Sequence, residues 1–125
     1  MTVAHDVGRA INPLAVEGQL DGQVFSGIGQ ILFEECCMEQ GQILNPSRLD
    51  YALPRTFEIP QIERIIVETN DPYGPFGAKE VAEGPMVTAA LTIANAVSNA
   101  IGYPIDEIPI SAERILKIIK QKKQA

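Results

Sequence analysis

Apolar residues recur every three or four positions between Pro13 and about Glu35, which is the spacing of an amphipathic helix. Asn12 and Pro13 stand where an N-cap and a first helical residue are expected. The apolar face consists of Leu20, Val24, Ile28 and Ile31. A second face collects small residues that lower helix propensity, namely Gly18, Gly22, Ser26 and Gly29. We therefore expect the helix backbone to approach a neighbouring element or a cofactor closely, although tight helix packing alone explains the pattern equally well.

Two further helices are predicted in the second half of the chain. Pro85–Ile101 is apolar nearly all round, so we expect a buried helix that begins at Pro85 and ends at Gly102, a good C-cap. Ser111 is placed to cap a final helix. The residues of that helix expected to face inward are Ile115, Leu116, Ile118 and Ile119.

Strand signals separate these helices. Thr2–Val7 is β-prone, and Ile62–Glu68 has a β-branched centre that predicts a buried strand. A short hairpin is expected from Cys36 to Leu44, turning at Gln40-Gly41. The whole pattern predicts an α+β fold in which a mixed β-sheet packs with helices, with residues 1–125 forming a single domain or a fragment of one.

Composition narrows the possible partners. The 125-residue chain carries a formal charge of −6, which argues against nucleic acid or an anionic membrane surface. It has no membrane-spanning run and no basic-then-apolar leader. Its only cysteines, Cys36 and Cys37, are adjacent and are expected to be half-buried free thiols, which fits a cytoplasmic protein. Four tail lysines are expected to complement the end of the last helix, namely Lys117, Lys120, Lys122 and Lys123.

The loop Gly74–Pro85 carries the candidate chemistry. It is rich in glycine and ends with Glu83 at the expected start of a helix, where the helix dipole favours an ionised carboxylate. An ionised carboxylate on a loop can accept a proton. The more common explanation of this pattern is a glutamate that only caps the helix.

Two motifs resemble one family. The run Gly77-Ala78-Lys79-Glu80-Val81-Ala82-Glu83-Gly84-Pro85 is similar to the active-site loop of the molybdenum hydroxylases, the xanthine oxidase and aldehyde oxidase family, in which Glu83 matches the catalytic glutamate. His5–Pro13 followed by Val16–Gly22 resembles a second family segment, in which Gln19 matches a glutamine that hydrogen-bonds molybdopterin. Gly18 and Ala82, beside these two residues, are further candidate cofactor contacts, and Ala82 stands where the family usually has glycine.

The resemblance implies that this chain is the C-terminal part of a molybdopterin-binding large subunit. In that family the dithiolene of molybdopterin holds the molybdenum, so no metal-ligating side chain is expected here. The resemblance further implies that Glu83 takes the proton from Mo–OH, after which this water-derived oxygen hydroxylates an aromatic, N-heterocyclic or aldehyde substrate. Electrons leave through iron–sulfur clusters and, optionally, FAD on partner subunits.

Two other readings remain open. The chain can be a detached module that folds but binds no cofactor by itself, because Gln19 and Glu83 alone cannot hold a pterin. It can also be an unrelated α+β domain whose glycine loop binds an anion at a helix start. Among the neighbouring polar residues, Lys79 and Glu80 are expected to be structural and His5 to be a packed histidine rather than a ligand.

Overall fold

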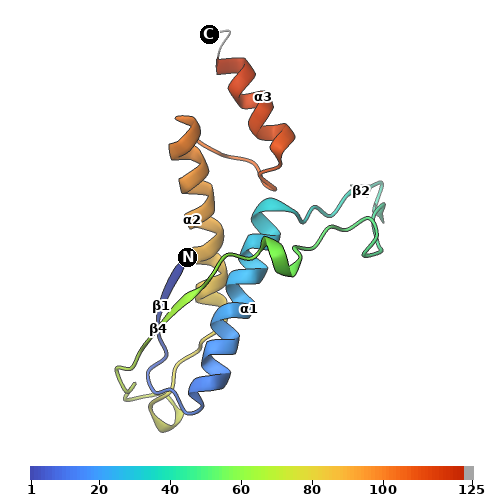
Figure 1. Cartoon of the computed structure of the whole chain (residues 1–125). Coiled ribbons are helices and arrows are strands. Elements are labelled where there is room, and N and C mark those ends of the chain that lie inside the picture. The colour runs from blue at the N-terminus through green and yellow to red at the C-terminus, as the bar shows by residue number, and fades with distance from the viewer. Residues whose placement is uncertain (123–125) are drawn as a thin grey trace.

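The computed structural model describes residues 1–122; residues 123–125, including Lys123, lie outside the described part. Its elements in chain order are β1 (Thr2–Asp6), α1 (Pro13–Leu32), β2 (Met38–Glu39), β3 (Gln42–Ile43), η1 (Thr56–Glu58), β4 (Glu63–Val67), η2 (Pro75–Gly77), α2 (Glu83–Ile101) and α3 (Ala112–Lys122). The α+β class is confirmed. Parallel and antiparallel pairing both occur, in two separate two-stranded sheets, β1–β4 and β2–β3. Figure 1 shows α1 and α2 side by side, with the β2 region projecting away from them.

Helix α1 starts as its sequence predicts. The Asn12 side chain accepts a hydrogen bond from the Ala15 N–H at 3.1 Å, and Pro13 opens the helix. The predicted apolar face is buried, with Leu20 and Val24 fully inaccessible to solvent. The helix ends at Leu32, where the N–H groups of Phe33 and Glu34 both bond the Gly29 carbonyl.

The close approach between α1 and α2 occurs at Gly27. A Cβ atom added there would lie 2.5 Å from the Met86 carbonyl oxygen and 2.9 Å from the Ala89 Cβ. Gly18 and Gly22, which were expected to make such an approach, would meet nothing within 4 Å. Gly18 and Gly22 therefore approach no neighbouring element, because they lie on a different face from the one that meets α2. Their expected approach to a cofactor stays a prediction.

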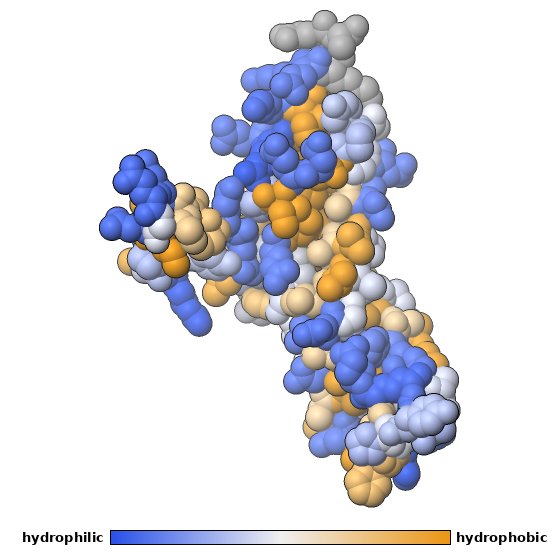
Figure 2. Space-filling model, turned by 180° about the vertical axis from the view of Figure 1, so that it is seen from behind, coloured by the Kyte–Doolittle hydropathy of each residue, from blue (hydrophilic) through white to orange (hydrophobic). Residues whose placement is uncertain are grey.

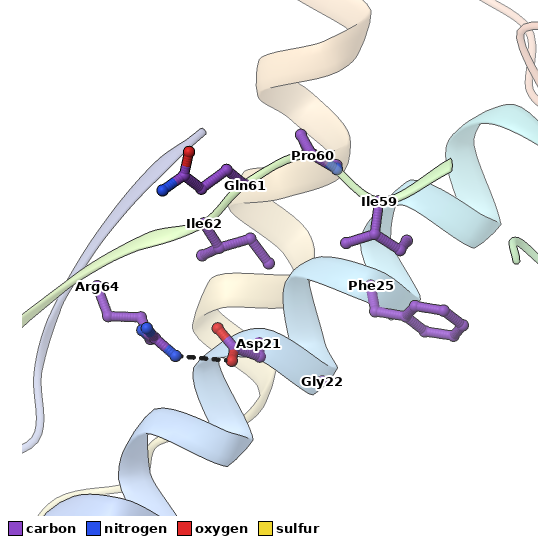
Figure 3. A pocket seen from close by; sticks show the side chains of 8 residues that line it. All are labelled: Asp21, Gly22, Phe25, Ile59, Pro60, Gln61, Ile62 and Arg64. Atoms are coloured by element: carbon purple, nitrogen blue, oxygen red, sulfur yellow. Dashed lines mark hydrogen bonds and ion pairs between the residues drawn. The ribbon is translucent and has the colours of Figure 1, made fainter. Parts of the chain in front are cut away.

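Strands β1 and β4 run parallel, with Thr2 opposite Glu63 and Asp6 opposite Val67. Arg64 reaches from β4 to Asp21 on α1 at 2.9 Å, beside a groove also lined by Phe25 and Ile62 (Figure 3), and this ion pair ties the sheet to the helix. The outward side chains Ile65 and Val67 remain 45% and 40% exposed. The prediction that β4 is buried was therefore wrong, because nothing within the described chain covers its outer face.

The β2–β3 hairpin turns at Gln40 and Gly41, whose φ angles of 49° and 81° are both positive, as a two-residue turn of this type requires. The hairpin prediction is confirmed. Cys36 and Cys37 are free but exposed rather than half-buried, because this segment projects from the body of the molecule (Figure 1).

Helix α2 ends and helix α3 begins where the sequence predicts, but both helices are less buried than expected. Gly102 caps α2 with a φ of 64°, and the Arg114 N–H donates to the Ser111 side chain at the start of α3. Only Pro85 and Ala89 of α2 are buried, and Leu116 of α3 is half exposed, contrary to prediction. Figure 2 shows apolar residues open at the surface among polar ones. No helix within residues 1–122 is long and apolar enough to cross a membrane.

The Gly27 contact gives a direct test of the helix packing. We expect Gly27→Ala to destabilise the chain by about 1–3 kcal/mol, because the new Cβ atom forces α2 away from its backbone contact. The matched control Gly22→Ala meets open space and should stabilise the chain by about 0.5–1 kcal/mol through helix propensity. Urea unfolding of both variants measures this. A change of stability in the same direction in both variants would contradict the helix packing described.

Candidate functional site

The loop between β4 and α2 is fastened to the end of β1. The Lys79 N–H donates to the Val7 carbonyl and the Asn70 N–H to the Gly8 carbonyl, both at 2.8 Å. Gly8 has a φ of 68°, and a Cβ atom there would clash with the Gly77 carbonyl. Only glycine at this position allows the two backbones to approach so closely.

The carboxylate of Asp6 joins three segments. It accepts hydrogen bonds from the Lys79 ammonium at 2.5 Å, the Thr69 hydroxyl at 2.8 Å and the Gly8 N–H at 2.9 Å. The Lys79 bond is the main cause that holds the pKa of Asp6 far below its ordinary range, and the same bond raises the pKa of Lys79. The prediction that Lys79 is structural is confirmed.

The loop tip is built around Asp71 and presents two aromatic rings. The Asp71 carboxylate accepts the N–H groups of Tyr73 and Gly74, both at 2.8 Å, and these bonds lower its pKa. Tyr73 and Phe76 are 96% and 82% exposed. Phe76 has a φ of 55°, which is uncommon for an aromatic residue. Neither ring is among the site residues predicted from the sequence, although aromatic residues inside a Pro/Gly loop are a visible signal.

Helix α2 begins at Glu83, two residues before the predicted start, so that Pro85 is its third residue. Ala82 precedes it with a φ of −100°, a conformation open to alanine without strain. The cap comes from Glu80, whose Oε2 accepts the N–H of Ala82 at 2.9 Å and that of Glu83 at 3.3 Å. The prediction that Glu80 is structural is therefore confirmed.

The Glu83 carboxylate itself is not used for capping. Glu83 is exposed, and no side chain or backbone group within residues 1–122 donates a hydrogen bond to its carboxylate. Glu83 lies in the first turn of α2, as the capping interpretation expects, but the hydrogen bonds to the N–H groups come from Glu80. A carboxylate at a helix start that has no structural partner is available to accept a proton.

His5 packs against the same segment. Its Nε2 lies 3.0 Å from the Glu80 carbonyl oxygen and 3.6 Å from Glu80 Oε1. A Cβ atom at Gly84 would lie 2.9 Å from His5 Cε1, so the ring rests on the first turn of α2. The prediction of a packed histidine is confirmed.

Gln19 meets the same loop from α1. It lines a hollow of about 240 Å³ together with Ala78, Lys79 and Val81, and its side chain is exposed. Gly18, Ala82 and Glu83 are not among the lining residues. The structure therefore brings Gln19 to the loop that carries Glu83 but places the two in different surroundings. Within the described part of the chain, no three His, Cys, Asp or Glu side chains are arranged to hold a metal ion.

Residues 1–60 match the family described as "Molybdopterin cofactor-binding domain". The chain is 40% identical over 113 residues to the xanthine dehydrogenase molybdenum-binding subunit of Escherichia coli O157:H7, covering 89% of this chain and 15% of that protein. It is 33% identical over 120 residues to the carbon monoxide dehydrogenase large chain of Hydrogenophaga pseudoflava, covering 93% and 15%. The chain belongs to the molybdopterin-binding family of the molybdenum hydroxylases.

A solved structure of this family has the same fold. Quinoline 2-oxidoreductase from Pseudomonas putida 86 superposes with a TM-score of 0.88 at 34% identity, covering 96% of this chain and 16% of that chain. The chain thus spans about 15% of the length of the curated molybdenum hydroxylase subunits it matches. The expected fold, family and type of cofactor are confirmed by these likenesses.

The Asp6 network predicts a defined pH dependence. Because the folded pKa of Asp6 lies below its ordinary value of 3.8, its stabilising effect is complete above that pH and is lost as pH falls below it. We expect Asp6→Asn to be less stable than the wild type at pH 7, with the difference shrinking below about pH 4. Thermal unfolding between pH 2 and 8 measures this difference.

A suitable control is Glu107→Gln, since Glu107 is exposed and accepts no hydrogen bond from residues 1–122. This variant should unfold at the same temperature as the wild type at pH 7. A stability loss in Asp6→Asn that stays constant down to pH 2 would contradict the role given to the Asp6 carboxylate.

Proposed function

We propose that this chain supplies the proton-accepting base of a molybdenum hydroxylase and that Glu83 is this base. The observation that carries the proposal is the division of roles at the start of α2, where Glu80 makes the capping bonds and no group within residues 1–122 donates a hydrogen bond to the Glu83 carboxylate. Glu83 is the first residue of α2 and its side chain is exposed, so a reacting group can reach its carboxylate, as a base requires. Glu83 takes up on its carboxylate the proton released during hydroxylation with water-derived oxygen.

The residues beside Gln19 fit a large planar cofactor in part. The amide of Gln19 can donate and accept at once, as the edge of a pterin requires. Gly18 and Gly22 leave open space above α1, where a Cβ atom would meet nothing within 4 Å. When bound, the molybdenum cofactor supplies the redox centre that accepts the electrons of the substrate. Gln19 would contact it, with the backbone at Gly18 and Ala82 close by.

The surface of the chain favours assembly with larger partners. Its accessible area is 8824 Å², whereas a folded monomer of 13.6 kDa is expected to expose about 6,600 Å². Exposed apolar side chains on β4 and α2, such as Ile65 and Leu91, account for part of this excess. We infer that the chain works with the remainder of a molybdopterin-binding subunit, with an iron–sulfur subunit and optionally an FAD subunit, in the cytoplasm.

An aromatic or N-heterocyclic small molecule is the substrate class we favour, with an aldehyde as the alternative. Xanthine and quinoline, which appear in the names of two of the matching proteins, are N-heterocycles. Tyr73 and Phe76 offer exposed rings on the loop that leads to Glu83, where a flat substrate can stack.

A second candidate function is a folded module that binds no cofactor. The observation in its favour is that Gln19 lines its own hollow, which Glu83 does not share. In that case neither residue has a chemical task, and substitutions at both should leave cofactor content and activity of any assembly unchanged.

Glu83→Gln tests the proposed base. We expect the turnover of the assembled enzyme to fall about 10²–10⁴-fold, because an amide cannot accept the proton. The stability of the chain should hardly change, since Glu83 is exposed and makes no side-chain hydrogen bond within residues 1–122. Steady-state kinetics at saturating substrate measures the effect. Glu107→Gln is the control, and a fully active Glu83→Gln enzyme would contradict the proposal.

Gln19→Ala tests the cofactor contact. Loss of the amide should weaken retention of molybdopterin in the assembly by about tenfold, the equivalent of one or two hydrogen bonds. Fluorescence of the oxidised pterin released from equal amounts of purified enzyme measures its content. Gln30→Ala, on the same helix but beside Met86, serves as control. Equal pterin content and equal release rates in all three proteins would favour the non-binding module.

A further inference from the structure

We propose that Glu80 is a positioning residue for Glu83 and that His5 holds Glu80 in place. The inference rests on the proposed role of Glu83 as base. The Glu83 carboxylate lies at an exposed helix start, where no side chain within residues 1–122 holds it, so its orientation must be set by the backbone.

The first step is the pair of bonds from Glu80. Its Oε2 accepts the N–H groups of Ala82 and Glu83 at 2.9 and 3.3 Å. These two bonds fix the backbone immediately before and at Glu83, and the backbone sets where the Glu83 side chain starts. The negative charge of Glu80 also lies against the positive end of the α2 dipole, which strengthens the contact.

The second step is the anchoring of Glu80 by His5. A carbonyl oxygen only accepts hydrogen bonds, so the 3.0 Å contact between His5 Nε2 and the Glu80 carbonyl requires that Nε2 carries the hydrogen. His5 belongs to β1 and lies opposite Ile66 of β4 in the ladder. The strand pair is therefore connected to the Glu80 backbone through one side chain.

Gly84 makes this arrangement possible. A Cβ atom at Gly84 would stand 2.9 Å from His5 Cε1, so a larger residue would push the histidine ring away, whereas its distance of 3.4 Å from Glu80 Oε1 is an ordinary contact. The residues on either side of Glu83 thus have separate tasks. Glu80 takes the helix cap, Gly84 leaves room for the histidine, and Glu83 remains open.

The consequence is a competition between two carboxylates. Without Glu80, the N–H groups at the start of α2 lose their acceptor, and the Glu83 carboxylate becomes the nearest replacement on its own helix. Glu83 would then turn back to cap the helix and would no longer face a substrate. Misplacement of a reacting group by about 1 Å typically costs about 10²-fold in rate.

The test compares Glu80→Ala with Glu80→Gln. The glutamine keeps an oxygen that can accept both N–H groups, whereas alanine cannot accept either. In Glu80→Ala we expect amide hydrogen exchange at Ala82 and Glu83 to accelerate at least about tenfold, measured by NMR on the full chain, which needs no molybdenum. In the assembled enzyme kcat should fall about 10–100-fold with little change in KM. Glu80→Gln should restore most of both.

Ser111→Ala is the matched control, since Ser111 accepts the Arg114 N–H at the start of α3 and makes no contact with the start of α2. It should lower stability without accelerating exchange selectively at Ala82 and Glu83. Glu80→Leu, which keeps much of the side-chain volume but has no acceptor atom, replaces Glu80→Ala if that variant fails to fold.

Unchanged exchange at Ala82 and Glu83 in Glu80→Ala would overturn the positioning role, as would equal loss of kcat in Glu80→Ala and Glu80→Gln. Failure of the proposed function is separate from these results. It would show as full activity in Glu83→Gln, whatever the exchange rates at Ala82 and Glu83.

Discussion

The carboxylate of Asp6 is the contact on which the candidate site depends. It ends β1, bonds the Gly8 turn that leads to α1, and binds both Thr69, just after β4, and Lys79, within the glycine-rich loop. The backbone bonds from Lys79 to Val7 and from Asn70 to Gly8 complete this attachment of the loop to the end of β1. With Lys79 fixed, the chain reaches the start of α2 in a defined direction. Glu80 and Glu83 are placed by that direction together with the His5 contact.

The start of α2 separates a structural task from a chemical one. A helix start needs acceptors for its first N–H groups, and a base needs an open carboxylate. One glutamate cannot serve both needs at once. Here Glu80 accepts the N–H groups and Glu83 stays exposed. Alanine is compatible with this geometry, because the φ of −100° at position 82 is accessible to residues other than glycine.

Features set by local chemistry could be predicted from the sequence. Asn12 and Pro13 start α1, Gly102 ends α2, and Gln40-Gly41 turns the hairpin, because each depends on a few neighbouring residues. Burial could not be predicted in the same way. The apolar runs of β4 and α2 are typical of buried elements, yet Ile65, Val87 and Leu91 are exposed, because this chain alone does not supply their cover. The close helix contact at Gly27 and the cap by Glu80 depend on register between distant segments, which no local pattern reveals. The roles of Glu83, Gln19, Gly18 and Ala82 stay predictions from the family resemblance.

The most direct test of the account is the molybdenum content of the assembly that forms around this chain in its native host. The complex would be captured through the chain and measured by elemental mass spectrometry together with the masses of its partners. The account predicts stoichiometric molybdenum, together with a larger molybdopterin-binding chain and an iron–sulfur subunit. A folded chain isolated without molybdenum and without these partners would contradict it, and Glu83 would then be an exposed carboxylate with no chemical task.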